Sequence, residues 1–235
     1  MTRIVVVALA ALLAAATLLP GPAPSAQADC IALEDFKQAP VGEFPQGWRV
    51  RKNEGQQVYR VADEGGIHFL RAVSRGLGIQ AARETSGWDL RARPVLAWSW
   101  RPRQFPKGAD EREPSRNDSA LSVYMLVEHS RIKGPKAVKY VWSERVPPGT
   151  HLTSNNGLTQ VRVLRTGAAN GGGWTDERVN VLEDFQKYFD DKDTPQPAGI
   201  AVLTDADDTR SVAAGDYAKF RACPVAASAS PPTGR

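Results

Sequence analysis

The sequence predicts an all-β fold, an antiparallel β-sandwich with one short amphipathic helix. Short β-rich runs recur along the chain between clusters of Gly, Pro and Asn, a spacing typical of sandwiches. Only one stretch has the spacing of apolar residues that an amphipathic helix needs. The length of 235 residues fits a single domain of this kind once an apolar N-terminal segment is set aside.

The expected strands are runs rich in β-branched and aromatic residues. They cover 32–36, 56–61, 67–74, 77–83, 95–101, 120–128, 137–144, 160–166, 199–204 and 216–222. Two connections, 101–118 and 166–174, are long and rich in charged residues or glycine. We expect both connections to be solvated.

The predicted helix covers residues 175–191. Val181, Phe185 and Phe189 recur four residues apart, and charged or amide side chains occupy most of the other positions. Such a helix has one apolar stripe, so we expect it to lie across a sheet edge or to close an open end of the sandwich.

The N-terminal segment 1–28 has the features of a secretory signal peptide. Arg3 precedes an apolar run over 4–19, and Ala26 and Ala28 form a small-x-small cleavage pattern. A membrane anchor is the alternative, but the run is shorter than the ~20 residues that a spanning helix needs. We therefore predict cleavage after Ala28 and an exported protein, periplasmic or secreted, without a stable membrane anchor.

After the leader we expect one β-sandwich domain over 29–224 and a disordered tail over 225–235, which is rich in Pro, Ala and Ser. Cys30 and Cys223 are the only cysteines and mark the two ends of this domain. In an oxidising compartment they favour a disulfide over two free thiols. The formal net charge is only +4, and the basic residues are scattered, so nucleic acid is not an expected partner.

Six tryptophans are many for this length. Period-2 alternation places Trp98 and Trp100 on one face of their strand and Arg101 on the other, and Trp142 lies in a second aromatic strand. Large aromatic side chains are mostly buried in sandwiches, so a core position is the more frequent fate. The alternative is an exposed platform on which sugar rings stack. For Tyr124 two orientations are open, toward the second sheet or toward a cleft.

Three acidic residues, Asp205, Asp207 and Asp208, follow the strand expected over 199–204. Three interpretations are open: a turn in which Asp side chains accept backbone N–H groups, pairing with Arg or Lys, or a Ca²⁺ site. An aspartyl phosphotransferase is excluded, because too little chain follows the motif to supply the rest of its active site. Apart from a possible Ca²⁺ ion, the sequence indicates no cofactor.

The chain resembles an uncharacterised bacterial family of exported domains, a domain of unknown function, in the order and spacing of six segments. These segments are 44–48, 93–101, 107–110 leading to Asp118, 139–144, 172–189 and 200–209. The resemblance implies a jelly-roll sandwich of the galactose-binding-like or lectin-like type, and no established activity. Asp118, Asn180, Asp184, Asp205 and Asp207 match polar positions of its motifs. Ser122 departs from the family, which tends to have Arg there.

We predict an exported, non-catalytic binding module, with carbohydrate or a cell-envelope glycan as the ligand. A hydrolase or lyase that uses paired carboxylates is one alternative, with Asp118, Glu128, Glu144, Asp205 and Asp207 as candidate acids. A structural or protein-interaction sandwich without a small-molecule site is the other. The expected ligand-binding residues are Trp98, Trp100, Arg101, Asp118, Tyr124, Trp142, Asp205 and Asp207.

Overall fold

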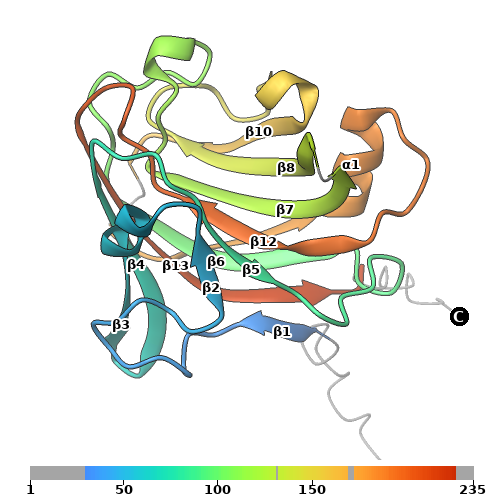
Figure 1. Cartoon of the computed structure of the whole chain (residues 1–235), viewed down its shortest axis with the longest axis horizontal. Helices are drawn as coiled ribbons and strands as arrows, with labels where there is room; N and C mark the ends of the chain where they lie inside the picture. The colour runs from blue at the N-terminus through green and yellow to red at the C-terminus, as the bar shows by residue number, and fades with distance from the viewer. Residues whose placement is uncertain (1–29, 131, 169–171, 226–235) are drawn as a thin grey trace, which may run out of the picture.

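The computed structural model describes residues 30–130, 132–168 and 172–225. Two β-sheets stack face to face, so the all-β sandwich is confirmed (Figure 1). The expected leader over 1–28 lies outside the described residues, as does the expected tail except for Val225. No helix among the described residues is long and apolar enough to cross a membrane.

Sheet A has six strands. In sheet order they are β11 (Thr175–Asn180), β6 (Val95–Gln104), β13 (Val212–Cys223), β4 (Ile67–Arg75) and β3 (Tyr59–Glu64), with β1 (Ile31–Glu34) also paired to β13. All of these pairs are antiparallel.

Sheet B has seven strands. In sheet order they are β2 (Trp48–Val50), β5 (Ala81–Glu84), β12 (Pro197–Leu203), β7 (Leu121–Ser130), β8 (Gly134–Ser143), β10 (Thr159–Thr166) and β9 (His151–Ser154). One pair departs from the expected antiparallel pattern, because β10 runs parallel to β8. The connection over 144–158, which contains β9, is long enough for the crossover that parallel strands require.

The aromatic strands do not form an exposed platform, and here the expectation of sugar stacking is wrong. Strands β6 and β8 belong to different sheets and face each other across the core. Trp98, Trp100 and Trp142 are 2%, 0% and 3% exposed, and the Trp98 ring centroid lies 5.7 Å from that of Tyr140. Removing apolar ring surface from water stabilises the fold, so these tryptophans lie in the core, the more frequent position for such rings.

The helix is shorter than predicted. Helix α1 spans Val181–Phe189, and the preceding residues Thr175–Asn180 form strand β11. The Asn180 side chain caps the helix by accepting a hydrogen bond from the Glu183 backbone N–H at 3.2 Å. Short 3₁₀ helices cover Asn53–Val58 (η1), Pro114–Arg116 (η2) and Asn155–Gly157 (η3).

The two ends of the described chain meet (Figure 1). Cys30 and Cys223 form the predicted disulfide, and β1 pairs beside it with β13 through Ile31 and Ala222. The bond thus closes almost the whole domain into one covalent loop.

Candidate functional site

The outer face of sheet B carries a second apolar cluster, separate from the core. In β7, Val123 and Met125 point into the sandwich, so Tyr124 between them points outward. Residues from four strands build the cluster: Ala82, Tyr124, Leu126, Ala137, Ala201 and Leu203.

A pocket of about 590 Å³ lies on this face where β12 ends and β7 begins, and we call it the Tyr124 pocket. Three strands of this part of sheet B, β12, β7 and β8, lie side by side in Figure 1. Strands and the loops at their ends line it: Arg51, Lys52, Gly78, Ile79, Gln80, Asn117, Tyr124, Lys139, Ser154, Asn155, Thr159, Leu203 and Asp205.

Lys139 is a buried cation in the wall of this pocket. It is 6% exposed, and its Nζ lies 5.6 Å from the centroid of the Tyr124 ring. Burial disfavours the ammonium form, but nearby Tyr124, Asp205 and Glu111 outweigh this effect and raise the pKa of Lys139 above its usual value. Lys139 is therefore a positively charged donor at neutral pH.

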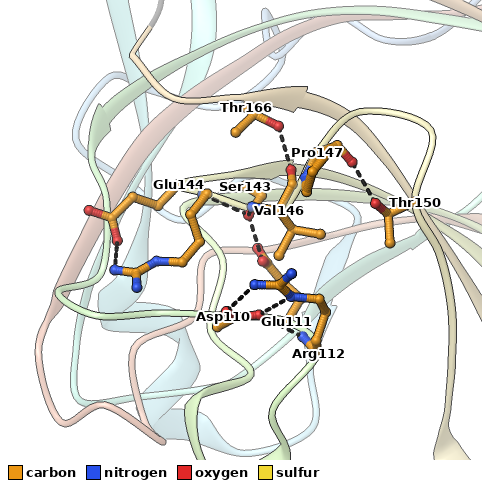
Figure 2. Close-up of polar contacts among 10 residues, drawn as sticks. Asp110, Glu111, Arg112, Ser143, Glu144, Val146, Pro147, Thr150 and Thr166 are labelled. Atoms are coloured by element: carbon orange, nitrogen blue, oxygen red, sulfur yellow. Dashed lines mark hydrogen bonds and ion pairs between the residues drawn. The ribbon is translucent and has the colours of Figure 1, made fainter.

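The connection between β6 and β7 is anchored beside the pocket and is only partly solvated, contrary to expectation. Glu111 is 7% exposed, and its carboxylate accepts hydrogen bonds from Ser119 Oγ at 3.1 Å and Ser143 Oγ at 2.6 Å. Figure 2 shows Glu111 directed at Ser143 of β8, with the Asp110–Arg112 pair beside it. These buried contacts hold the loop that carries Asn117 and Asp118.

Asp110 gives this loop a pH-dependent contact. Arg112 Nε and Nη2 donate to its carboxylate at 2.8 Å and 2.6 Å, and this guanidinium lowers the pKa of Asp110 from 3.8 to about 2. Because the folded-state pKa lies below the unfolded one, the contribution to stability is present above pH 4 and is lost as the pH falls toward 2.

We therefore expect Arg112→Gln to unfold at lower urea concentration than the parent protein above pH 4, with the difference shrinking between pH 4 and pH 2. Urea denaturation at each pH measures this difference. A difference that stays constant over the whole range would mean that Arg112 acts only by packing.

Three carboxylates, which we call the acidic cluster, converge at the rim of the Tyr124 pocket. One oxygen each of Asp118, Asp205 and Asp207 lies within 4.8 Å of the others. Asp205 is 9% exposed and its Oδ1 has no hydrogen-bond partner. Burial raises the pKa of Asp205 to about 8; Lys139 opposes this shift, while Asp207 and Asp118 add to it.

Part of the ligand-binding set expected from the sequence lies at this candidate site. Tyr124, Asp118, Asp205 and Asp207 come together at one end of sheet B. Asp208 was expected beside Asp205 and Asp207 as a metal ligand, but Asp118 takes its place in the group of converging oxygens. The Asp208 backbone N–H donates instead to Asp118 Oδ1 at 3.3 Å.

Arg101 is not at this site. It lies on sheet A, is 5% exposed, and donates from Nε to Asp216 Oδ2 at 2.7 Å. Its guanidinium carbon also lies 4.3 Å from the centroid of the Trp174 ring. The expectation that Arg101 and Tyr124 contact one ligand is therefore wrong, because they belong to different sheets.

Sequence reasoning missed Lys139, Asn117 and Thr159, which line the Tyr124 pocket. The usable signal was Lys139 itself, a single cation inside the apolar run over 137–142. A slightly larger groove, about 640 Å³, lies toward the other end of β7, but its lining includes the exposed Glu128 and His129. The Tyr124 pocket is the better candidate because its lining includes the buried polar residues Lys139, Thr159 and Asp205 beside an apolar surface.

A family model described as "Protein of unknown function (DUF3047)" matches residues 46–221. No curated protein matches the sequence. Among solved structures, the family 11 carbohydrate-binding module of a cellulosomal cellulase of Clostridium thermocellum is 8% identical with a TM-score of 0.41, over 83% of this chain and 95% of that chain. The family 11 xylanase from Neocallimastix patriciarum is 12% identical with a TM-score of 0.34, over 80% and 96%. These similarities are too low to indicate a ligand.

Proposed function

The chain belongs to the DUF3047 family of proteins of unknown function, and from the Tyr124 pocket we propose that it is an exported, non-catalytic module that binds carbohydrate or a cell-envelope glycan. The proposal rests on one observation, the combination of an apolar surface with hydrogen-bonding side chains in one pocket. Tyr124 and Leu203 supply the apolar surface, and Asn117, Lys139 and Thr159 supply donors and acceptors. A sugar presents both an apolar C–H face and hydroxyl groups, so it fits such a lining.

The geometry disfavours a two-carboxylate hydrolase. Among the described residues that line the pocket, Asp205 is the only acid, whereas such hydrolases need two carboxyl groups facing the scissile bond. Glu144 pairs with Arg145, and Glu128 lines the groove toward the other end of β7. Asp118, Asp205 and Asp207 converge at the rim, but only Asp205 lines the pocket, so two carboxyl groups do not face one substrate position inside it.

The third function considered, a structural or protein-interaction module, agrees with the burial of Trp98, Trp100 and Trp142. Such a module should also present a flat, exposed apolar patch. The large hydrophobic residues that are exposed among the described part of the chain come from separate segments: Val41, Ile67, Ile132 and Val225. Isolated positions of this kind do not favour a protein interface.

Lys139→Met should weaken glycan binding by about 10- to 100-fold, because it removes a charged hydrogen-bond donor while keeping the length of the side chain. Calorimetric titration of the purified protein with a panel of neutral and acidic oligosaccharides measures the change. Lys219→Met is the matched control, since Lys219 is an exposed lysine on sheet A. The affinity of this variant for the glycan should equal that of the parent protein.

Two results would contradict the proposed function. One is that no glycan of the panel binds the parent protein. The other is that Lys139→Met, folded as judged by its thermal midpoint, binds as tightly as the parent protein does. Release of new reducing ends from any bound glycan would show catalysis in place of binding.

A further inference from the structure

The acidic cluster of Asp118, Asp205 and Asp207 is not explained by either of the local interpretations that the sequence leaves open. The backbone N–H groups of Asp208 and Thr209 and the Thr209 hydroxyl donate to the carboxylate of Asp118, which lies 90 residues before Asp208, so these are not the local turn contacts expected of Asp205, Asp207 and Asp208. The unpartnered Oδ1 of Asp205 has no such role.

Pairing with basic side chains does not explain the cluster either. Among the residues that the structure describes, no ion pair within 4.0 Å joins Asp118, Asp205 or Asp207 to a lysine, arginine or histidine. Asp118 is 0% and Asp205 9% exposed, so water screens the repulsion between these carboxylates poorly. Lys139 favours the charged form of Asp205 but forms no ion pair with it within 4.0 Å, so a positive charge or a proton among the three carboxylates would relieve their repulsion.

The oxygens converge beside a residue that has no side chain. A Cβ atom at Gly78 would lie 2.6 Å from Asp205 Oδ1 and 2.8 Å from Asp207 Oδ1, closer than real Cβ contacts allow. Glycine at this position thus lets the two carboxylates turn toward each other and toward Asp118. The buried oxygen without a partner, Asp205 Oδ1, is directed into this same space.

We propose that Asp118, Asp205 and Asp207 bind a divalent cation of the calcium type at the rim of the Tyr124 pocket. Carboxylate oxygens are the hard ligands that Ca²⁺ prefers, and its irregular coordination by six to eight oxygens tolerates donors from separate loops. The three carboxylates supply at least three of these oxygens. Mg²⁺ demands near-ideal octahedral geometry and gives up water reluctantly, so it should bind more weakly.

The cation joins segments that are far apart in the sequence. Asp118 precedes β7, Asp205 and Asp207 follow β12, and Gly78 lies between β4 and β5. The ion therefore stabilises the folded state by fixing one wall of the Tyr124 pocket. This inference does not depend on the identity of the pocket's ligand.

The experiment is a thermal-unfolding series on the purified protein with its disulfide intact, first after chelation and then with increasing CaCl₂ or MgCl₂. A ligand that binds only the folded state raises the midpoint, by about 5–10 °C for a protein of this size at a 100-fold excess over the dissociation constant. We expect this rise with Ca²⁺, a smaller one with Mg²⁺, and one bound Ca²⁺ per chain in a calorimetric titration.

Matched variants locate the ion. Asp207→Asn alters an exposed side chain and should fold, yet it should lose the Ca²⁺-dependent rise, as should Asp205→Asn. Asp208→Asn changes an acid of the same turn outside the group of converging oxygens, so it should keep the full rise.

Two results would overturn the proposal. The first is the absence of any Ca²⁺-dependent rise in the parent protein, which would mean that a proton in place of a cation relieves the repulsion among these carboxylates. The second is a rise that persists in both Asp205→Asn and Asp207→Asn.

Discussion

Removing the Cys30–Cys223 disulfide should lower the free energy of unfolding by about 5 kcal/mol. The two cysteines are 193 residues apart, so their bond restricts nearly all of the unfolded chain of the domain. In the chain-entropy model the stabilisation rises with the logarithm of the loop length, which gives this magnitude. The corresponding fall in thermal midpoint is about 10–20 °C for a domain of this size.

Urea denaturation with and without a reductant measures the effect, and the double variant Cys30→Ala with Cys223→Ala provides the control. The double variant should match the reduced parent protein and should not respond to reductant. Strand β1 should remain paired with β13 in the folded double variant, because its ladder through Ile31 and Ala222 does not need the bond. A loss below about 1 kcal/mol would mean that the unfolded chain is already restricted by residual structure.

Asp216→Asn should destabilise the protein by about 3–5 kcal/mol, because it leaves buried positive charge without its partner. Asp216 is 0% exposed, and its carboxylate accepts hydrogen bonds from the Nε atoms of Arg71, Arg101 and Arg103 at 3.1, 2.7 and 2.8 Å. Arg101 itself is 5% exposed and cannot regain full hydration in the folded state.

The same network contains its control. Glu64 also pairs with Arg101, but its side chain is 59% exposed. Glu64→Gln should therefore leave the urea midpoint nearly unchanged, since exposed ion pairs contribute little. Equal losses for Asp216→Asn and Glu64→Gln would contradict the assignment of the stability to the buried carboxylate.

Most strands could be predicted from the sequence because their inward-facing residues are apolar. Strand β11 was predicted as part of the helix because its inward-facing residues are not all apolar. Its inward-facing positions are Glu177 and Val179, so a charged residue interrupts the apolar alternation. Glu177 is buried only because Arg165 Nε and Trp100 Nε1 donate to its carboxylate, at 2.6 and 3.1 Å, and such long-range partners are not visible in a local pattern.

The candidate site was predictable to a smaller extent. The acids around Asp205 stood out as a dense group, but nothing local indicated that Asp118 would replace Asp208 beside them. Period-2 alternation assigned Trp98 and Trp100 to one face correctly, yet it does not state which face is the core. The general burial of large aromatic side chains favoured the core for this face, but only the packing of β6 against β8 settles it.

The central claim is that the Tyr124 pocket on the outer face of sheet B binds a glycan. Titrating ¹⁵N-labelled protein with the tightest-binding oligosaccharide of the panel tests it most directly. We predict that the largest changes in amide chemical shift occur at lining residues such as Gln80, Asn117 and Asn155, with little change at Ser99 and Arg103 of sheet A. Changes centred on sheet A, or no changes with any glycan, would contradict the claim.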